Sequence, residues 1–334
     1  MAVYNASQYL QDSVNSIISQ DYSDYELILV DDASTDGSGE LCDEIAAKHP
    51  DFVRVIHHEK NEGLLIARRT FFYNAKGKWF IAVDADDLLV EGALEKLHSV
   101  IEMNECDLVL YDLECIHMNG RVERFTVPLQ DNHIFRGQEK KLVYEQISKN
   151  NYINSICTKA IYHTLIDYET DYTPWKSLRF GTDIFQSYAI FDNAKAILYL
   201  RESLYSYIKR KEAITTKWHK NWYIIRRMLW LRDKEFRTKW NMGVEYEIQA
   251  SESYIKGTVF YLDSQFIISP RYNQMKVWYQ SIYDDGDIKE CLEVVRNTKK
   301  RHRLYAMFLA NHRFTTLYYL QWLFYIAKKV LIER

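Results

Sequence analysis

The sequence lacks the features that mark several classes of protein. Its 43 lysine and arginine residues do not outnumber its 46 aspartate and glutamate residues, and the formal net charge is −3. Nucleic-acid-binding proteins usually carry a basic excess, so we expect no nucleic-acid partner. The five cysteines form no C-x-x-C pair and are widely spaced. This pattern fits reduced thiols better than a disulfide scaffold or a zinc site.

Long hydrophobic runs are also missing. No stretch of 18 or more apolar residues occurs, although about that length is needed to span a bilayer, and we find no secretory leader pattern. We therefore expect a cytoplasmic protein, with a peripheral position on the inner face of the plasma membrane as the second location that the sequence allows. With 334 residues, 47% of them hydrophobic, the chain can build two domains or one large domain with an appendage.

Short apolar runs alternate with amphipathic segments over the first hundred residues. The runs at 26–30, 53–56 and 79–83 are predicted to be strands, and helices are predicted between and after them. Ser7 is placed to cap the first helix. This alternation predicts an α/β fold with a mostly parallel sheet and helices on both of its faces. Further strands are expected at 107–113, 121–127 and 196–207, and further helices at 64–74, 94–101, 138–148 and 183–191.

Acidic residues stand where two of these strands end. Asp31 and Asp32 follow the first run, and Asp84, Asp86 and Asp87 follow the third. In open α/β sheets, ligands bind outside the carboxyl ends of the strands. Two carboxylates about 4 Å apart repel each other by about 4 kcal/mol at an effective dielectric constant near 20, and a divalent cation removes that repulsion. Oxygen ligands suit Mg²⁺ or Mn²⁺. We therefore expect a divalent metal, with a helix cap as the alternative role of Asp87.

The segment 31–38 allows a second interpretation as a calcium loop. Four of its residues match the first half of an EF-hand, namely Asp32, Ser34, Asp36 and Gly37. The twelfth position, however, is Asp43 rather than glutamate, and a strand rather than a helix precedes the segment. We favour a strand-end carboxylate that faces a nucleotide, with a purely structural helix cap as the remaining alternative.

Five motifs within about ninety residues resemble those of family 2 glycosyltransferases in order and spacing. They are Tyr4-Asn5, the stretch from Ser16-Ile17 to Gln20, Glu26 to Ser38, Asn61-Glu62-Gly63 with Ala67-Arg68, and Asp84-Ala85-Asp86-Asp87. Any one motif alone would be weak, but the set is specific. The resemblance implies the GT-A fold, a Rossmann-like α/β arrangement, and the use of a nucleotide-sugar donor.

The resemblance also implies a role for each matching residue. The donor-binding set would consist of Tyr4, Asn5, Asp31, Asp32, Arg68, Asp84, Ala85 and Arg210. Within it, Asp84 would contact the nucleoside side of the donor and Arg68 would support the loop or the phosphates. Asp86 would bind the metal, Mn²⁺ or Mg²⁺, that bridges the diphosphate. Uridine is the base that the resemblance favours.

A looser resemblance extends to about residue 215. The segment 180–185 is similar to a G-E-D-x-x-F motif whose aspartate is the catalytic base of the family, which implies Asp183 in that role, with Thr182 in place of the glutamate. Arg210 is the matching phosphate contact, whereas Ile208 and Ala213 replace an arginine and a serine that are frequent in the family. The implied activity is inverting transfer of a hexosyl or N-acetylhexosaminyl group, from a UDP-sugar to a saccharide or lipid-linked saccharide, in surface glycan synthesis.

The composition changes after Thr216 and predicts a helical C-terminal region. From Lys299 to Arg334 the tail holds eight basic residues and one acidic residue among aromatic and aliphatic ones. Such a pattern fits an interfacial helix on a membrane, or packing against the catalytic domain or a second subunit in a homo-oligomer. We thus expect a nucleotide-sugar-binding half at 1–105, an acceptor-binding half at 106–215, and a helical region at 216–334.

Two features leave other interpretations open. Only Met1-Ala2-Val3 precede Tyr4-Asn5, where the family opens with a full strand, so we expect that the true start lies upstream or that the chain was cut. A non-catalytic glycosyltransferase-like binding protein is one alternative function. A nucleotidyltransferase is the other, but it would need a phosphate loop rich in glycine and lysine near the first strand.

Overall fold

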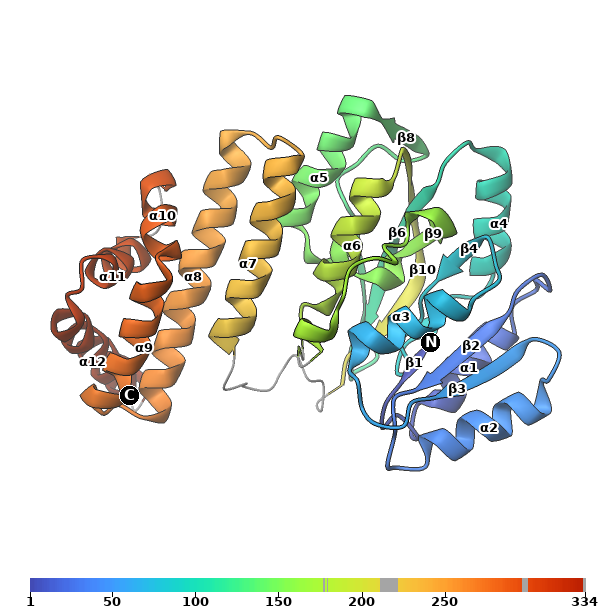
Figure 1. The fold of residues 1–334 in the computed structure, drawn as a ribbon, viewed down its shortest axis with the longest axis horizontal. Coiled ribbons are helices and arrows are strands. Elements are labelled where there is room, and N and C mark those ends of the chain that lie inside the picture. The colour runs from blue at the N-terminus through green and yellow to red at the C-terminus, as the bar shows by residue number, and fades with distance from the viewer. Residues whose placement is uncertain (177, 179, 211–221, 296–299, 333–334) are drawn as a thin grey trace. The chain divides into compact units, whose positions relative to one another are not determined.

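The computed structural model describes residues 1–176, 178, 180–210, 222–295 and 300–332. The chain divides into two compact units, Met1–Lys217 and Trp218–Arg334 (Figure 1). The predicted basic-loop residues 213–215 and the tail residues Lys299 and Arg334 lie outside the described residues. Each unit is presented by itself below.

A small parallel sheet begins the first unit. Its strands pair in the order β1-β2-β3. They are β1 (Ala2–Val3), β2 (Leu27–Asp31) and β3 (Val53–His57), and the helices of this part are α1 (Leu10–Ile18), α2 (Ser38–Lys48) and α3 (Leu64–Asn74). Every residue of β2 is buried, because a strand covered on both faces is apolar throughout rather than alternating.

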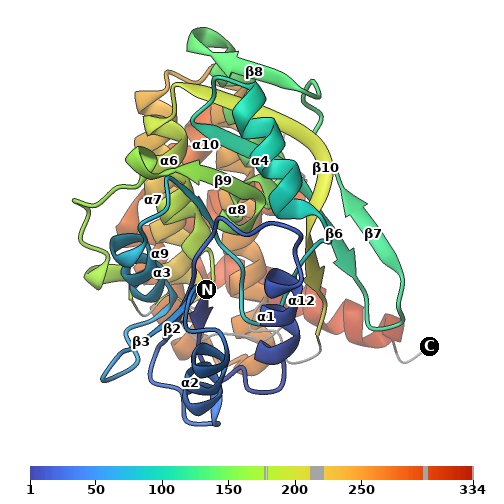
Figure 2. The ribbon, with the colours of Figure 1, turned by 90° about the vertical axis from the view of Figure 1, so that its right-hand side faces the viewer.

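A larger mixed sheet forms the rest of this unit. Its strands run in the order β4-β9-β6-β10-β5, with β7 paired to β6 and β8 paired to β10. These strands are β4 (Trp79–Ile81), β5 (Leu88–Leu89), β6 (Leu108–Ile116), β7 (Val122–Phe125), β8 (His133–Arg136), β9 (Lys159–Tyr162) and β10 (Ala196–Ile208). Figure 2 shows β10 as a long curved strand, whose pairing with β6 shifts register between Leu200 and Ser203 and between Ser203 and Tyr205.

Helices and short 3₁₀ turns connect the strands of the larger sheet. The helices are α4 (Ala93–Met103), α5 (Lys140–Lys149) and α6 (Thr182–Asn193). The 3₁₀ turns are η1 (Gly137–Glu139), η2 (Asn151–Asn154), η3 (Ile156–Thr158), η4 (His163–Leu165) and η5 (Thr173–Trp175). The three helices lie within a few residues of the predicted positions, whereas the 3₁₀ turns were not predicted.

Two local expectations are corrected by the structure. The smaller sheet is parallel, as predicted, but the larger sheet is mixed, since β4 pairs antiparallel with β9 and only β6 and β10 are parallel within it. Hydrophobic periodicity identifies a strand but not its partner. Ser7 does not cap α1, which begins at Leu10 after Tyr9; instead the Ser7 N–H donates to an Asp36 carboxylate oxygen at 3.0 Å.

The second unit is helical, which confirms the predicted helical C-terminal region. Its helices are α7 (Trp222–Lys239), α8 (Val244–Ile268), α9 (Tyr272–Asp285), α10 (Asp287–Val294), α11 (Lys300–Ala310) and α12 (Phe314–Ile332). Arg237 is buried here, where it pairs with Asp233 at 2.5 Å and Glu247 at 2.9 Å and stacks 4.0 Å from the Trp230 ring centre. In the described parts of the chain, no helix has the length and apolar character that a membrane crossing requires.

Candidate active site

The guanidinium of Arg68 lies at the centre of the candidate site. The residue belongs to α3 and is only 1% exposed. One of its terminal nitrogens, Nη1, donates to Asp183 Oδ1 at 2.5 Å, and the other, Nη2, donates to Asp84 Oδ1 at 3.0 Å. A planar guanidinium presents donors in a fixed fork, so it can hold two carboxylates in a set orientation. Two acids that are 99 residues apart in the sequence are thereby joined through one cation.

Charge compensation around Arg68 favours its cationic form. Burial alone would lower the pKa of the guanidinium, but the neighbouring carboxylates of Asp183 and Asp84 raise it above its ordinary value. The two carboxylates are not buried with it, since their side chains are 32% and 35% exposed. The bridge therefore consists of a buried guanidinium and two partly exposed carboxylates that a ligand can reach.

Asp183 stands in the first turn of α6. Its Oδ1 also receives the backbone N–H of Ile156 at 3.4 Å, so this oxygen is anchored from two sides. The helix starts after Gly181, which has a positive φ of 71°, and the amino end of a helix stabilises a negative charge. An oriented carboxylate that is open to solvent can accept a proton from a bound hydroxyl group.

The segment after β4 presents its acids on one side. Ala85 is buried, whereas the side chains of Asp84 and Asp86 are 35% and 51% exposed. Asp84 and Asp86 can therefore both face a ligand. Side chains two residues apart are not held to the geometry of a strand here, because β4 ends at Ile81. Burial raises the pKa of the Asp86 carboxyl, and the nearby Asp84 raises it further.

Asp87 fastens this segment to β10. Its Oδ2 accepts the Tyr205 hydroxyl at 2.7 Å and its Oδ1 accepts the Ile208 N–H at 2.8 Å. The same tyrosine oxygen accepts the N–H of Asp84 at 3.3 Å. Burial, followed by the carboxylates of Asp86 and Asp84, raises the pKa of Asp87 to about 8. The alternative role of Asp87 as a helix cap is wrong, because α4 begins at Ala93, directly after Gly92.

Arg210 lies over the same acidic segment. It donates to the backbone oxygen of Asp86, and its Nε is 3.9 Å from Asp86 Oδ2. The guanidinium carbon lies 3.7 Å from the ring centre of Tyr9, a stacked geometry that stabilises a cation. Arg210 is thus held beside Asp86 by an aromatic ring that the sequence did not single out.

Tyr4 and Asn5 lie at the carboxyl end of β1. Tyr4 is 45% exposed, so its ring is available to a ligand. Asn5 has a positive φ of 49° and joins two loops, since its N–H donates to Ser34 Oγ at 3.0 Å and its Oδ1 accepts the Thr35 N–H at 2.8 Å. Asn5 therefore orders the loop that follows β2.

Asp31 and Asp32 are buried and already hydrogen-bonded. The Asp31 carboxylate accepts the N–H of Ser34 at 3.1 Å and lies 3.1 Å from His57 Nδ1. Asp32 accepts two N–H groups of the turn before α3, from Glu62 at 2.9 Å and Gly63 at 2.8 Å. Both aspartates shape the rim of the site through the backbone.

Two histidines support these aspartates, His57 as the last residue of β3 and His58 directly after it. His58 Nδ1 lies 2.7 Å from Asp32 Oδ1, and its Nε2 lies 2.9 Å from Thr70 Oγ1. His57 contacts Asp31 and Asp43 in the same way, and these hydrogen bonds raise the pKa of its imidazole. The parallel register of β2 and β3 aligns Asp31 with His57. The sequence shows both dipeptides, but their alignment depends on strand pairing.

Comparisons with known proteins find similarity to glycosyltransferases. Residues 1–164, just under half of the chain, match the family model described as Glycosyl transferase family 2. Among curated proteins, the chain is 26% identical over 226 residues to glycosyltransferase GlyA of Streptococcus pneumoniae, which covers 66% of this chain and 31% of that protein. It is 38% identical over 108 residues to glycosyltransferase GlyG of the same organism, covering 32% of this chain and 36% of that protein. The chain thus spans about a third of the length of these two relatives.

A solved structure extends the likeness over nearly the whole chain. TarS residues 1–349 of S. aureus, crystallised in complex with UDP-GlcNAc, superimposes with a TM-score of 0.67 at 17% sequence identity. The match covers 98% of this chain and 90% of that one. At this identity the likeness shows the fold. The fold is GT-A, with a helical C-terminal region, as predicted.

Proposed function

Because residues 1–164 match the family model of glycosyl transferase family 2, we propose that the protein transfers a sugar from a nucleotide-diphosphate donor to a carbohydrate acceptor with inversion. The observation that carries this proposal is the bridge from Asp84 through Arg68 to Asp183. It holds an acid of the donor side and the candidate base on one buried cation. Inverting transfer requires that the base lie close to the bound donor.

The donor side is proposed to lie between the loop after β1 and the segment after β4. Tyr4, Asn5, Asp31 and Asp32 form or shape the nucleoside part, and Asp84 and Ala85 continue it. We propose a UDP-sugar, and within that class a hexosyl or N-acetylhexosaminyl donor. The TarS structure in complex with UDP-GlcNAc supports this choice, as does the half-exposed ring of Tyr4, which a base can stack against.

The carboxylates present fit a divalent cation that is held together with substrate. Mg²⁺ and Mn²⁺ sites of this kind use one or two carboxylates plus phosphate oxygens. Asp86 is half exposed, and Asp84 lies close enough to raise the pKa of its carboxyl. Within the described residues, no group of three metal-ligating side chains comes together; Asp86 is the proposed metal ligand. When bound, the cation would neutralise charge on the leaving diphosphate.

The acceptor side is proposed to centre on Asp183. A sugar hydroxyl is a poor nucleophile at neutral pH, so a base must take its proton as it attacks the anomeric carbon. The bond to Arg68 and the Ile156 N–H hold one carboxylate oxygen, Oδ1, which leaves the other oxygen to accept the proton. Arg210, beside Asp86, adds a positive charge near the departing diphosphate. We therefore assign residues 1–105 to the donor half and 106–215 to the acceptor half.

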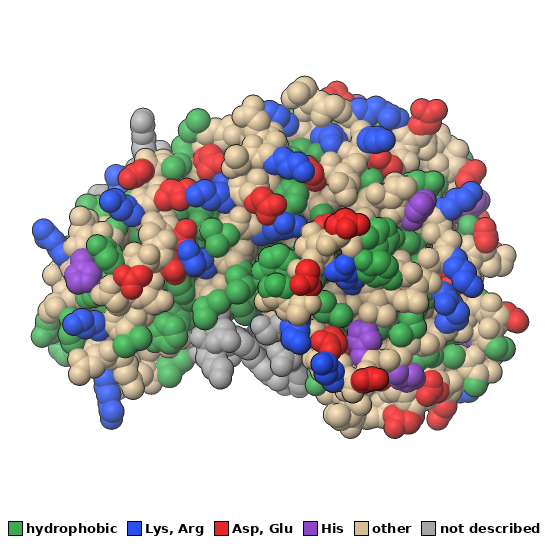
Figure 3. Space-filling model, viewed as in Figure 1, with side chains coloured by type: hydrophobic (Ala, Val, Ile, Leu, Met, Phe, Trp, Pro, Cys, Tyr) green, Lys and Arg blue, Asp and Glu red, His purple; other side chains and the backbone are tan. Residues whose placement is uncertain are grey.

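The helical region from 216 onward is proposed to contact a membrane surface that carries a lipid-linked saccharide acceptor. Tyr319, Trp322, Leu323 and Ile326 of α12 are exposed by 60%, 43%, 57% and 38% and follow the spacing of a helical stripe. Phe324 and Tyr325 outside this stripe are also exposed, by 44% and 36%. Figure 3 shows other hydrophobic side chains among basic and acidic ones over these helices, at the left. A cytoplasmic enzyme placed peripherally on the inner face of the plasma membrane fits this pattern.

A liposome experiment distinguishes two possible partners of this stripe, a membrane and a second copy of the chain. The triple substitution Trp322→Ser, Leu323→Ser and Ile326→Ser should abolish flotation with anionic liposomes. The control is Phe260→Ser on α8, another exposed position at 61%, which should float normally. If the triple variant floats like the parent chain, or if the parent chain stays in solution and dimerises, the membrane assignment is refuted.

The activity itself is tested with a panel of nucleotide sugars. Thermal-shift measurements with and without Mn²⁺ should identify a UDP-sugar that raises the apparent Tm, because ligand binding stabilises the folded state. Donor turnover is then compared for the parent chain, Asp183→Asn, and the matched control Asp192→Asn at the far end of the same helix. Turnover that is unchanged in Asp183→Asn, or equally reduced in both variants, would remove Asp183 from the proposed role.

A further inference from the structure

A lysine side chain is completely buried near the candidate base. Lys159 begins β9 and is 0% exposed. Its Nζ donates to the carbonyl oxygens of Ile153 at 2.6 Å and Ser155 at 2.5 Å, and it lies 5.0 Å from the ring centre of Phe191 on α6. Burying an ammonium group is costly unless the group is paired or hydrogen-bonded, so a lysine at this position calls for a function.

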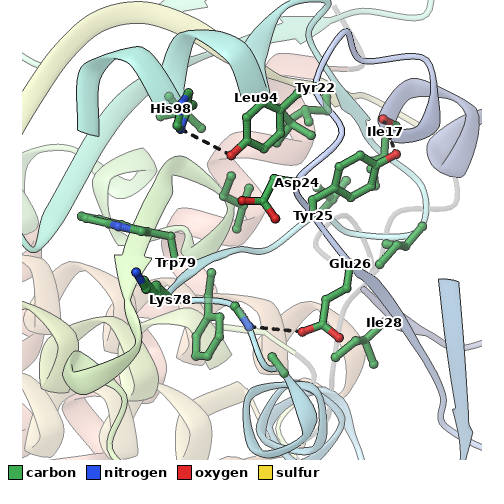
Figure 4. Close-up of a pocket in the computed structure, with 18 of the residues that line it drawn as sticks. Ile17, Tyr22, Asp24, Tyr25, Glu26, Ile28, Lys78, Trp79, Leu94 and His98 are labelled. Carbon is green, nitrogen blue, oxygen red and sulfur yellow. Dashed lines mark hydrogen bonds between the residues drawn. The ribbon is translucent and has the colours of Figure 1, made fainter. Parts of the chain in front are cut away.

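The surroundings of the amino group are protein atoms. A cavity of about 500 Å³ does occur in the first unit, and Figure 4 shows Ile17, Ile28 and Leu94 among its walls. Lys159 is not one of the residues that line this cavity. Because the side chain is fully buried and lies outside the cavity, the two carbonyl oxygens and the face of the Phe191 ring take the place of water around Nζ.

One peptide group connects Lys159 with Asp183. The carbonyl oxygen of this group belongs to Ser155 and accepts from Lys159 Nζ. Its N–H belongs to Ile156 and donates to Asp183 Oδ1 at 3.4 Å. The C=O and N–H of one peptide are conjugated through the same planar bond, so a cation on the oxygen makes the N–H a stronger donor. Hydrogen bonds in such a chain reinforce one another.

Other hydrogen bonds fix the orientation of this peptide group. The 3₁₀ turns η2 and η3 lie on either side of Ser155. The hydroxyl of Ser187, on α6, donates to the carbonyl oxygen of Asn154 at 2.6 Å, and Thr158 Oγ1 donates to the Ser155 carbonyl oxygen at 3.0 Å. The N–H of Ile156 is therefore held toward the first turn of α6, where Asp183 accepts it.

The charge of Lys159 acts on the same carboxylate. Burial lowers the pKa of the amino group to about 7, whereas Asp183 and the thiol of Cys157 raise this pKa and Arg68 lowers it. The Tyr111 hydroxyl of β6 is also adjacent, since it donates to the Lys159 carbonyl oxygen at 3.4 Å. Asp183 is thus linked to two buried cations, to Arg68 directly and to Lys159 through one peptide group. Because Lys159 is mostly protonated below about pH 7, its charge acts on the acid side of the pH range.

We propose that Lys159 is a positioning residue for the candidate base, which acts through the peptide group of Ser155 and Ile156 to hold Asp183 Oδ1 and to favour the ionised carboxylate. This role rests on the proposed function, in which Asp183 takes the proton of the acceptor hydroxyl. With Oδ1 held by Arg68 and by the peptide N–H, the other oxygen is directed to the acceptor. Because it is fully buried, Lys159 itself contacts no substrate.

A lysine that only stabilised the η2–η3 segment would behave differently. Its loss would lower the melting temperature, and it would reduce turnover by the same factor whether or not the Asp183 carboxylate is present. A lysine that acts through Asp183 must instead lose its effect on turnover once that carboxylate is removed. The acid limb of the pH profile is a second distinction, because removal of a nearby cation disfavours an ionised carboxylate.

The test compares Lys159→Met in the parent chain and in an Asp183→Asn background. Methionine keeps much of the side-chain length and removes the charge and the donors. The assay is release of UDP from the UDP-sugar that the thermal-shift panel selects. Lys140→Met is the matched control, because Lys140 also donates to a backbone carbonyl oxygen, that of Ala194 at 2.6 Å, and also lies near an aromatic ring, 5.6 Å from the ring centre of Tyr144.

The expected loss is in turnover rather than in donor binding. Lys159→Met should lower kcat roughly tenfold, which corresponds to about 1.4 kcal/mol, and should leave the donor KM within about twofold of the parent value. The acid limb of kcat should move to higher pH by at least about half a unit. In the Asp183→Asn background, the same substitution should change kcat by less than about twofold. An equal loss in both backgrounds, or a loss no larger than that in Lys140→Met, overturns the proposal.

A second variant carries the test if Lys159→Met does not fold. Ile156 is the first residue of η3 and follows Ser155, whose ψ is 131°, so the backbone accommodates a proline there. Ile156→Pro removes the N–H that Asp183 accepts, and it should reproduce the loss of kcat and the shift of the acid limb. Ile156→Ala keeps the N–H but removes more apolar volume, and it should do neither. Equal behaviour of the two variants overturns the proposal.

The same measurements separate this proposal from the proposed function. If Asp183→Asn keeps the turnover of the parent chain, Asp183 is not the base and both proposals fail. If Asp183→Asn loses at least about a hundredfold in turnover while Lys159→Met matches Lys140→Met, the assignment of the base stands and the role of Lys159 is refuted.

Discussion

Replacing Arg68 by methionine removes the one cation that the Asp84 and Asp183 carboxylates share. The side chain of Arg68 is 2% exposed, so methionine occupies similar space but leaves both acids without a partner. Breaking a fully buried ion pair costs about 3–5 kcal/mol. Because the two carboxylates are about one-third exposed and water partly screens them, we expect a loss of about 2–4 kcal/mol in the free energy of unfolding.

This loss should appear as a lower melting temperature of the first unit. For a unit of this size, 217 residues, each kcal/mol corresponds to roughly 2–4 °C. The expected decrease is therefore about 4–16 °C. Urea unfolding gives the free energy, and hydrogen exchange in α3 and α6 shows whether the loss is located at the bridge.

A double variant distinguishes the bridge from simple loss of packing. Arg68→Met should lower the free energy of unfolding by less in an Asp84→Asn background, because only Asp183 then loses an ion-pair partner. The coupling energy should be at least about 1 kcal/mol, within the usual range for contacting residues. If Arg68→Met stays within about 0.5 kcal/mol of the parent chain, or if the coupling energy is zero, the bridge does not hold this site together.

Three further predictions concern the base, the metal and the amino terminus. Asp183→Asn should lower turnover at least about a hundredfold, the usual contribution of a general base, while calorimetry finds donor affinity unchanged; a loss of affinity instead would point to donor binding. Asp86→Ala should abolish the Mn²⁺-dependent part of donor binding, and unchanged affinity with Mn²⁺ would exclude Asp86 as the ligand. In a chain prepared so that it begins at Met1, the free amino group of this residue, whose pKa falls from about 8 to about 5, should destabilise the fold fully below pH 5 and cease to do so above pH 8. Acetylation should therefore add up to about 4 kcal/mol at pH 5, because each tenfold loss of proton affinity on folding corresponds to about 1.36 kcal/mol. The acetylated chain must be compared with the unmodified chain at the same pH, because the raised pKa of Asp87 makes the fold itself less stable as the pH rises over this range. Equal unfolding curves of the two chains at pH 5 would contradict the burial of the Met1 amino group.

Local patterns predicted the elements that frame the site. The apolar run that ends at Asp31-Asp32 is β2, and the predicted helix at 64–74 coincides with α3. Both depend on residues that are near one another in the chain, where hydrophobic spacing is informative. The aspartates that follow two of the predicted strands likewise indicated a ligand site before any strand pairing was known.

Long-range contacts could not be predicted in the same way. The bond from Arg68 to Asp183 spans 115 residues, and that from Asp87 to Tyr205 spans 118. No local pattern shows that these side chains meet, because their meeting depends on how β4, β9 and β10 pair. The mixed sheet order was missed for the same reason. The alignment of two aspartates with two histidines also required the β2–β3 register.

The configuration of the first-formed sugar tests the proposed inverting transfer most directly. The chain is incubated with Mn²⁺ and an α-linked UDP-sugar, and water serves as acceptor while proton NMR follows the anomeric signal before mutarotation. With Asp183 acting as base at the centre that Arg68 holds together, the β-anomer should form first in the parent chain and should be almost absent in Asp183→Asn. Release of the α-anomer first, or equal release by both chains, would contradict inversion at this site.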